Sequence, residues 1–449
     1  MANRWNVIIA GGGPAGLFAA LELSRIPGLT ILVIEKGKDI DQRTNLVSGL
    51  GGAGAFSDGK LILSSHTGGR LTDYLPKREV EALIHQVDGT YRRFGAPEQV
   101  YGTEPEIDKI SRRAAAAGLR LVNSPVRHLG TDRCRSVLRA MRDHLISRVE
   151  FRLETRASRV IADGCQVMGV AVDGDEKLDC DYLILAPGRE GADWLSGQAK
   201  LLGLTTHNNP VDVGVRVEVL APVMAGLTDL LYEAKLEYLS RSFSDRIRTF
   251  CMCPSGEVIT ETTGGDDPVV TVNGQSYANR RTGNTNFAVL VSTDFTRPFH
   301  EPIAYGKYLA RLANILSGGV LVQRLGDLLS GHRSTPERIA QGAVRPTLQS
   351  ATPGDVSFAL PYRHLTGIVE MLQAMDSLVP GLASPDTLLY GIEVKFYSYR
   401  PELSPGLETE IKNLFCIGDG AGVSRGLIQA SASGVIAARE IMQREGRKQ

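Results

Sequence analysis

The sequence lacks any hydrophobic run long enough to cross a bilayer. A membrane-spanning helix needs about 20 apolar residues, and the apolar segments of this chain are far shorter. The apolar stretch near the start, Val7 to Ala10, is too short for the hydrophobic region of a secretory signal. We therefore expect a protein without a membrane partner and with a cytoplasmic location.

The chain also lacks an excess of charge of either sign. It has 50 Lys and Arg against 50 Asp and Glu. Domains that bind nucleic acids usually carry a basic excess, so no nucleic-acid partner is predicted. The six cysteines are scattered, without the spacing of a disulfide framework or of a metal cluster. We therefore expect reduced thiols and no metal site.

The most informative segment present is the glycine-rich turn that follows the first apolar stretch. Residues 7–16 read Val-Ile-Ile-Ala-Gly-Gly-Gly-Pro-Ala-Gly, and a second apolar strand at 31–34 ends in Glu35. This order of strand, Gly-x-Gly-x-x-Gly turn, helix, strand and acid is the dinucleotide-binding fingerprint. The sequence therefore predicts a dinucleotide site at the start of the chain.

Each part of this fingerprint has a physical role. Gly11 permits the tight turn, Gly13 lets the backbone approach a pyrophosphate, and Gly16 lets the helix pack on the strand. The start of the helix supplies free N–H groups for the phosphates, and Glu35 can accept hydrogen bonds from ribose hydroxyls. We predict further cofactor contacts near these segments and near a later buried strand, from Pro14, Ala15, Lys36, Arg43, Ser57, Gly59, Lys60, Ala186 and Gly188. For Arg43 and Lys60 the alternative is a solvated surface charge.

A segment near the end of the chain indicates which dinucleotide is bound, FAD or NAD. A short apolar strand at 414–417 runs into Gly418 and Asp419. The Asp419 carboxylate can accept hydrogen bonds from a ribityl chain, which FAD has and NAD lacks. A helix that begins near Leu427 and Ile428 would direct its N-terminus at the flavin N1–C2=O edge. We therefore predict FAD; the alternative for Asp419 is a turn or helix-cap residue.

The order of elements predicts an α/β protein with two domains. Residues 1–204 form a Rossmann-like FAD-binding domain with a helical insert at about 76–123, and residues 411–449 return to it. Residues 205–410 form a β-rich α+β substrate or cap domain. Within it, Val211–Val219 alternates apolar and polar residues as an exposed sheet would.

Four blocks of residues carry a resemblance to a known family. They are Gly-Gly-Ala-Gly-Ala-Phe-Ser-Asp-Gly-Lys-Leu at 51–61, Arg-His-Leu-Gly-Thr-Asp at 127–132, and the segments 213–218 and 250–254. With them the chain resembles the uncharacterised FAD-dependent dehydrogenases, which have the glutathione-reductase-like FAD-binding fold. The resemblance implies FAD and redox chemistry. Where that family usually has tyrosine and glycines, this chain has Val-Ser-Arg-Gly, which puts Arg425 near the expected flavin ring.

Candidate substrate residues precede the returning strand. Alternation puts Glu393, Lys395, Tyr397 and Tyr399 on one face of a strand. Such a face could bind a carboxylated or phenolic substrate, with a tyrosine or lysine as acid or base. We predict Lys395, Tyr397, Tyr399 and Arg425 as catalytic residues; the alternative is an exposed strand face.

Two other pairs share strand faces. Arg216 and Glu218 are two residues apart and could pair with each other. Cys251 and Cys253 have the same spacing, and we interpret them as small buried residues. The alternatives for the two cysteines are a redox-active pair and a metal pair.

The predicted function is that of an FAD-dependent oxidoreductase. We expect a dehydrogenase or reductase that transfers a hydride at flavin N5, acting on a small organic substrate that is anionic or aromatic. The sequence has no second dinucleotide fingerprint, so NAD(P)H would dock only transiently; oxygen, a redox protein and the substrate are the other electron partners. A flavin monooxygenase and a non-catalytic flavoprotein are the alternatives, and the β-rich domain is compatible with a homodimer.

Overall fold

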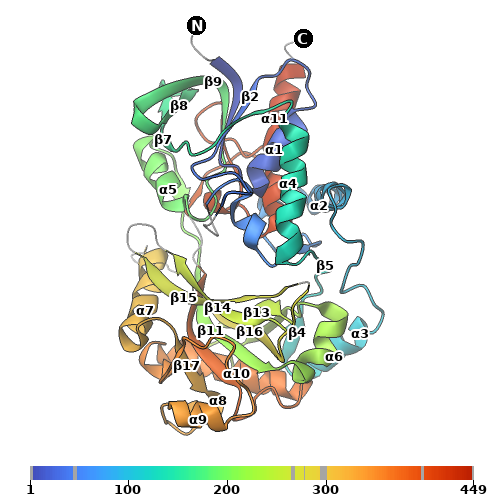
Figure 1. The fold of residues 1–449 in the computed structure, drawn as a ribbon, viewed down its shortest axis with the longest axis vertical. Helices are drawn as coiled ribbons and strands as arrows, with labels where there is room; N and C mark the ends of the chain where they lie inside the picture. Colours follow the sequence, from blue (N-terminus) through green and yellow to red (C-terminus); the bar gives the residue numbers. More distant parts are fainter. Residues whose placement is uncertain are drawn as a thin grey trace. The chain divides into compact units, whose positions relative to one another are not determined.

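The computed structural model describes residues 4–43, 48–263, 268–277, 279–293, 301–395 and 399–446. The chain divides into two compact units, which Figure 1 shows as ribbons. The first unit comprises Met1–Gln99, Arg127–Asn209 and Tyr397–Gln449, and the second comprises Val100–Val126 and Pro210–Phe396.

The first unit is built on a sheet with a parallel centre. The strand β1 (Arg4–Ala10) lies between β2 (Ile31–Ile34) and β9 (Glu176–Leu185), and both pair with it in parallel. The strand β6 (Glu150–Arg152) pairs with β2, and β21 (Leu414–Cys416) pairs with the last residues of β9. All four residues of β2 are buried, as expected for a parallel strand that is covered on both faces.

An antiparallel ribbon continues this sheet at the start of β9. The strands β7 (Ala157–Ala162) and β8 (Val167–Val172) pair with each other, and β8 pairs with the first residues of β9. An Asp-Gly turn at 173–174 joins β8 to β9, in agreement with the turn chemistry of hairpins. The helix α5 (Ala192–Leu201) follows β9.

Helices pack around the start of α1 (Pro14–Leu23), which follows the glycine turn and has proline at its first position. Its neighbours are the long C-terminal helix α11 (Leu427–Gly446) and α4 (Thr131–Leu145). The helix α2 (Lys77–Arg93) packs on α11. The last helix of the chain is thus part of the same core as the first (Figure 1).

The second unit contains an eight-stranded, largely antiparallel sheet. In spatial order its strands are β18 (Thr352–Pro353), β17 (Leu321–Arg324), β19 (Leu388–Lys395), β11 (Val211–Leu220), β16 (Asn284–Thr293), β13 (Arg246–Cys253), β12 (Leu236–Leu239) and β4 (Leu119–Leu121). The valines of β11 face an apolar core that contains residues of α10 (Tyr362–Leu378) and α7 (Pro302–Ser317). A separate hairpin consists of β14 (Glu257–Thr263) and β15 (Val269–Gln275).

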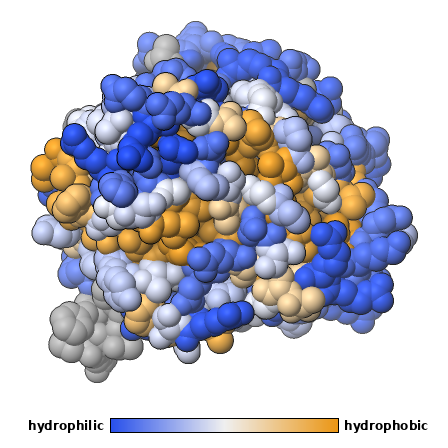
Figure 2. All heavy atoms as spheres, turned by 90° about the horizontal axis from the view of Figure 1, so that it is seen from below, coloured by the Kyte–Doolittle hydropathy of each residue, from blue (hydrophilic) through white to orange (hydrophobic). Residues whose placement is uncertain are grey.

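Smaller helices complete the second unit: α3 (Ile107–Ala116), α6 (Ala221–Leu231), α8 (Leu325–Leu329) and α9 (Pro336–Gln341). Large apolar side chains remain exposed in this unit, among them Ile315 at 75% and Tyr362 at 77%. Figure 2 shows hydrophobic patches between hydrophilic residues on the face seen from below. Among the described residues, no helix has both the length and the apolar character needed to span a bilayer.

The predicted fold class is confirmed: an α/β unit with a Rossmann-like parallel sheet is joined to a sheet-rich α+β unit. One difference concerns the helical insert expected at 76–123. Only its first part, with α2, lies in the first unit, because β4 pairs with β12 and draws residues 100–126 into the second unit.

The prediction that Val211–Val219 forms an exposed sheet is wrong. Every residue from Val211 to Val219 is buried. The polar side chains of β11 are covered by different neighbours: the hairpin strand β15 covers Arg216, whereas Tyr390 and Thr347 contact Glu218. A Cβ atom at Gly274 of β15 would overlap the guanidinium of Arg216, and buried charges are tolerated where they find partners.

Candidate functional site

The carboxyl ends of four parallel strands meet at one edge of the first unit's sheet. Ala10 of β1 is in register with Ile34 of β2 and with Leu185 of β9, and Leu185 is in register with Cys416 of β21. The residues that follow these strands are therefore neighbours in space. Ligands of open α/β sheets bind at such an edge.

The glycine turn after β1 is closely packed. Gly11 has φ = +119°, and a Cβ there would overlap the carbonyl oxygen of Ala186. A Cβ at Gly16 would overlap the carbonyl oxygen of Gly11. The roles predicted for Gly11 and Gly16, a tight turn and close helix packing, agree with this geometry, and Ala186 is the residue that Gly11 approaches.

The first turn of α1 offers amide donors without acceptors. The described residues provide no hydrogen-bond acceptor for the N–H groups of Gly13, Ala15 and Gly16, and Pro14 has no N–H. Above Gly13 there is space, since a Cβ there would meet only the Cα of Gly52, at 3.8 Å. Free amides at a helix start form an anion-binding site, so this cradle fits a pyrophosphate.

Glu35 is buried and holds the turn from the end of β2. Its Oε2 accepts the N–H of Gly12 at 2.9 Å, and its Oε1 accepts the N–H groups of Gly37 and Gly49, each at 3.0 Å. A carboxylate has about four acceptor positions, so one remains for a ribose hydroxyl. Lys36, the next residue, forms a 2.9 Å ion pair with Glu190, which follows β9.

The segment Gly49–Phe56 lies directly on the glycine turn. The N–H of Gly51 donates to the carbonyl of Gly12 at 2.8 Å, and a Cβ at Gly54 would lie 2.6 Å from Pro14 and 3.0 Å from Leu427. The sequence did not reveal this role, because the segment follows no strand. Its run of glycines was the signal for a close backbone approach.

The Arg43 side chain holds this glycine-rich segment in place by hydrogen bonds to its backbone. Its Nη1 donates to the carbonyls of Leu50 and Gly52, both at 2.8 Å, and its guanidinium stacks 4.9 Å from the ring centre of Phe56. Burial lowers the pKa of Arg43, but the side chain stays charged at neutral pH. Arg43 is thus buried, and the alternative of a solvated surface charge is wrong.

Ser57, Gly59 and Lys60 form the next turn. Ser57 Oγ donates to the carbonyl of Gly54 and accepts the N–H of Gly59, both at 3.2 Å. Gly59 has φ = +70°, and a Cβ there would lie 2.5 Å from the sulfur of Cys134. Lys60 is buried, and its Nζ pairs with Asp58 at 2.7 Å. Lys60 is therefore not a solvated lysine.

His128, which lies next to this ion pair, makes the stability of the folded protein depend on pH. Lys60 begins β3 (Lys60–Ile62), which pairs with β5 (Val126–His128). Burial lowers the pKa of His128 to about 4, although the Asp58 carboxylate raises it. In the unfolded chain a histidine has a pKa of about 6.5. Between these values the unfolded chain binds a proton that the folded chain does not, so acid favours unfolding.

We predict that the thermal midpoint falls as pH drops from about 6.5 to about 4, with this site contributing roughly 3 kcal/mol. The variant His128→Gln should lose less stability over that range, because glutamine takes up no proton. A matched control is His85→Gln, at an exposed position of α2. Thermal melts at each pH measure the effect; equal slopes for the wild type and the His128 variant would contradict it.

The end of the chain brings a second set of groups to the same edge. A Cβ at Gly418, which follows β21, would lie 3.1 Å from the Cβ of Ala15. Asp419 follows it, half-buried, and accepts a hydrogen bond from Ser424 Oγ at 2.6 Å. A Cβ at Gly420 would overlap the carbonyl oxygen of Gly188. Asp419 therefore lies beside the glycine turn, at the strand ends where Ala186 and Gly188 also lie.

The start of α11 resembles the start of α1. Leu427 and Ile428 begin this helix, and the described residues offer no acceptor to their amide N–H groups. The residue Arg425 just before it is half-buried, and its N–H donates to the carbonyl of Gly68 at 2.9 Å. Gln429 donates from Nε2 to Thr67 at 2.9 Å. Two helix starts with free amides thus lie at one sheet edge.

A buried charged cluster lies on β11 and β19 in the second unit. Arg216 and Glu393 are both fully buried and are 3.4 Å apart, and Lys395 Nζ lies 3.1 Å from Glu393. The alternative of an exposed strand face is therefore wrong for Glu393 and Lys395, and β19 ends at Lys395, before Tyr399. Glu218 does not pair with Arg216; it accepts hydrogen bonds from Tyr390 at 2.5 Å and from Thr347 at 2.6 Å.

The predicted catalytic residues are divided between the two units. Lys395 belongs to the second unit, whereas Tyr399 and Arg425 belong to the first. Tyr399 is half-buried just before β20 (Arg400–Pro401). Tyr397 lies outside the described residues.

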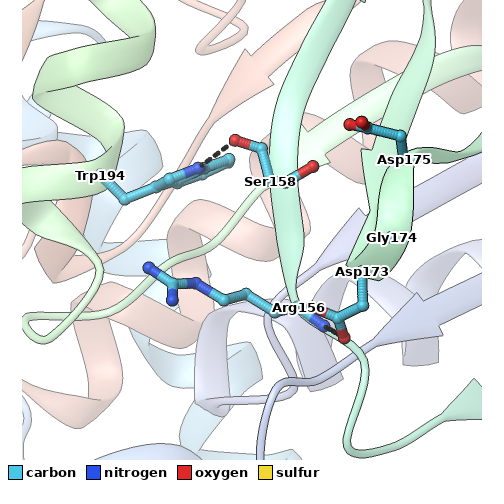
Figure 3. A pocket seen from close by; sticks show the side chains of 6 residues that line it. All are labelled: Arg156, Ser158, Asp173, Gly174, Asp175 and Trp194. Atoms are coloured by element: carbon cyan, nitrogen blue, oxygen red, sulfur yellow. Dashed lines mark hydrogen bonds between the residues drawn. The ribbon is translucent and has the colours of Figure 1, made fainter.

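A surface hollow lies at the other end of the first unit's sheet. It is lined by Arg156, Ser158, Asp173, Gly174, Asp175 and Trp194, and its volume is about 350 Å³ (Figure 3). The Trp194 indole donates to the carbonyl of Ser158 at 2.9 Å. Because residues 173–175 precede the first residue of β9, this hollow is remote from the carboxyl edge and is no part of the cofactor site.

Comparisons with known families agree with this geometry. The family described as FAD binding domain matches residues 6–193, and the family described as FAD-dependent protein, C-terminal domain-like, matches residues 212–396. A third family, glucose inhibited division protein A, matches residues 364–448. An uncharacterized protein of Clostridium beijerinckii is 27% identical over 483 aligned residues, which cover 97% of this chain and 80% of that protein.

Three solved enzyme structures can be aligned with nearly the whole chain. Quinol fumarate reductase of E. coli has a TM-score of 0.44 at 13% identity, covering 99% of this chain and 71% of that one. L-proline dehydrogenase of P. horikoshii has a TM-score of 0.44 at 12% identity, covering 99% and 94%. Glycine oxidase of Bacillus cereus has a TM-score of 0.41 at 14% identity, covering 98% and 95%.

The residue ranges matched by the two family models contain the elements described above. The FAD binding domain match contains the glycine turn, Glu35 and the strand that ends at Leu185. The C-terminal domain match contains β11, the hairpin and β19. The chain therefore contains an FAD binding domain, with FAD as its cofactor, and a second domain similar to the C-terminal domain of the FAD-dependent protein family.

Proposed function

We propose that this protein is an oxidoreductase that transfers a hydride between N5 of FAD and a small organic substrate, which carries an anionic group on an aromatic or apolar body. FAD, when bound, supplies the two-electron acceptor or donor. The observation that carries the substrate class is the surroundings of Phe250 on β13. Its half-buried ring has two cations near it, with Arg248 at 4.9 Å and Lys395 Nζ at 5.9 Å from the ring centre.

This arrangement suits an anionic substrate with a flat body. A ring offers a stacking surface, and flanking cations attract a carboxylate or phenolate. Both cations are held in place by acids: Arg248 contacts Asp212 at 2.5 Å, and Lys395 contacts Glu393 at 3.1 Å. Held cations lose little conformational freedom when they bind a substrate. We assign Lys395 the task of orienting the substrate's anionic group.

Anaerobic reduction of the flavin tests the proposal. The FAD-loaded protein is mixed without oxygen with a panel of aromatic and aliphatic carboxylates, phenols, neutral analogues, NADH and NADPH. We expect loss of the flavin absorbance band with an anionic member of the panel and not with its neutral analogue. Bleaching only by neutral compounds would contradict the substrate class, and a flavin that no donor on the panel and no dithionite reduces would contradict the enzymatic function.

Lys395→Met should slow flavin reduction by that anionic compound at least tenfold, which corresponds to about 1.4 kcal/mol. The amount of bound FAD should not change, because Lys395 belongs to the second unit. Lys395→Arg should restore part of the rate, and Lys200→Met, at an exposed position of α5, serves as the matched control. A Lys395→Met variant as fast as the control would exclude Lys395 from substrate binding.

A further inference from the structure

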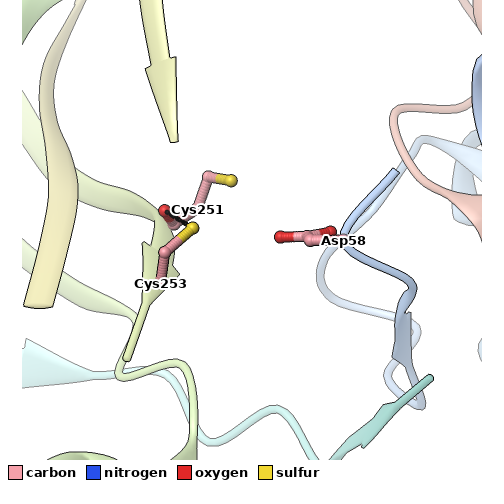
Figure 4. A group of neighbouring side chains, drawn as sticks. All are labelled: Asp58, Cys251 and Cys253. Atoms are coloured by element: carbon pink, nitrogen blue, oxygen red, sulfur yellow. Dashed lines mark hydrogen bonds between the residues drawn. The ribbon is translucent and has the colours of Figure 1, made fainter. Parts of the chain in front are cut away.

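Two cysteines lie together at the end of β13. The pairing of β13 with β16 shifts register between Phe250 and Cys253, and Cys251 has φ = +47°. Such a bulge bends the strand and re-aims its side chains. The sulfur atoms of Cys251 and Cys253 lie within 4.8 Å of each other, and Figure 4 shows them side by side. Rotation of the two side chains could therefore bring the sulfurs into bonding range.

A buried cation faces this pair. Arg216 Nη2 lies 3.3 Å from the sulfur of Cys253 and donates to the carbonyl of Cys251 at 2.5 Å. The guanidinium is fixed from its other side, because its Nε donates to Asn286 Oδ1 at 2.8 Å. A neighbouring cation stabilises the thiolate, which is the reactive form of cysteine. Cysteines that serve only as small buried residues need no such neighbour.

The two cysteines differ in exposure. Cys251 is half-buried, so a small reagent can reach it, whereas Cys253 is fully buried beside Arg216. A reachable thiol next to a second thiol with a stabilised thiolate is the arrangement of a reactive cysteine and its resolving partner.

We infer that Cys251 and Cys253 form a reversible dithiol–disulfide site that reacts with low-molecular-weight disulfides such as oxidised glutathione. The Cys251 thiolate attacks one sulfur of the reagent, the reagent's S–S bond breaks, and one thiolate leaves. The Cys253 thiolate then attacks the Cys251 sulfur, which forms the internal disulfide and expels the second thiolate. The two departing thiolates take up the two protons that the cysteines lost. The protein is oxidised by two electrons, and the reagent is reduced to two thiols.

A glutathione titration of the FAD-loaded full chain tests this inference. The protein is equilibrated in glutathione buffers from about −300 to about −180 mV, alkylated, digested and analysed by mass. We expect the peptide with both cysteines to carry an internal disulfide in more than half of the molecules at the oxidising end. At the reducing end that fraction should be less than a tenth. Cys165, an exposed cysteine, is the internal comparator and should carry only glutathione.

The single variants test the order of the steps. Cys253→Ser should trap glutathione on Cys251, because the resolving thiol is missing, and Cys251→Ser should leave Cys253 without an adduct. The inference is overturned if both cysteines of the wild type are alkylated at every potential, or if they carry glutathione without an internal bond. The wild-type titration decides this even where a variant does not fold.

Discussion

Replacing Gly434 by alanine is expected to destabilise the first unit by about 3 kcal/mol or more and to reduce the FAD content. Gly434 lies in the middle of α11, where this helix crosses α1. A Cβ there would overlap the carbonyl oxygen of Ala15 and lie 2.9 Å from the amide nitrogen of Ala19. Both atoms are backbone, so the helices must move apart. That movement displaces the amides of α1 that form the cofactor cradle.

The control for this variant lies in the same helix. Gly446→Ala, at the last residue of α11, adds the same methyl group where nothing lies within 4 Å. Thermal melts and the ratio of flavin to protein absorbance compare the two variants. A Gly434 variant that has the same melting temperature as the control and retains the same amount of FAD would disprove the close crossing of α1 and α11.

Replacing Gly13 by aspartate should stabilise the apoprotein slightly and weaken the binding of FAD strongly. Gly13 is the N-cap residue of α1, with extended backbone angles, and a Cβ there is accommodated. An aspartate at an N-cap accepts the amides two and three residues on, here Ala15 and Gly16, and adds about 0.3 kcal/mol of stability relative to glycine. The same carboxylate occupies the amide donors that would otherwise bind the pyrophosphate, and its negative charge repels the phosphates. We expect FAD to bind at least 100-fold more weakly, by about 2.7 kcal/mol.

Titration of the apoprotein with FAD, followed by flavin fluorescence, measures this loss. The control Gly89→Asp places the same charge on an exposed position of α2, in the same unit, where nothing lies within 4 Å of the added Cβ. It should bind FAD as the wild type does. Unchanged affinity in the Gly13 variant would mean that the phosphates do not bind at the start of α1.

The cofactor half of this protein was predictable from sequence because its signals are local. The strand, glycine turn and helix lie next to one another within residues 4–23, so a short sequence pattern identifies all three. Each glycine of the turn is required for a steric reason that can be stated from the sequence alone. The return of the chain at Gly418 and Asp419 was also readable, since a buried strand and a helix of small residues flank it. The convergence of the two segments follows once β9 pairs with both β1 and β21.

The second unit was less predictable because its contacts are made between strands. The sequence puts Arg216 two residues from Glu218, but Arg216 pairs with Glu393 on the adjacent strand β19. A bulge in β19 changes the register beside Gly214, and no local pattern announces it. The burial of Arg216 likewise depends on a hairpin that is distant in sequence.

The central claim is that FAD binds where the strands β1, β2, β9 and β21 end together. A crystal structure of the FAD complex tests it most directly. We predict phosphate oxygens at about 3 Å from the amide nitrogens of Gly13, Ala15 or Gly16, and the ribityl chain within hydrogen-bonding distance of Asp419. A cofactor bound elsewhere, or one whose ribityl chain lies out of reach of Asp419, would contradict the account.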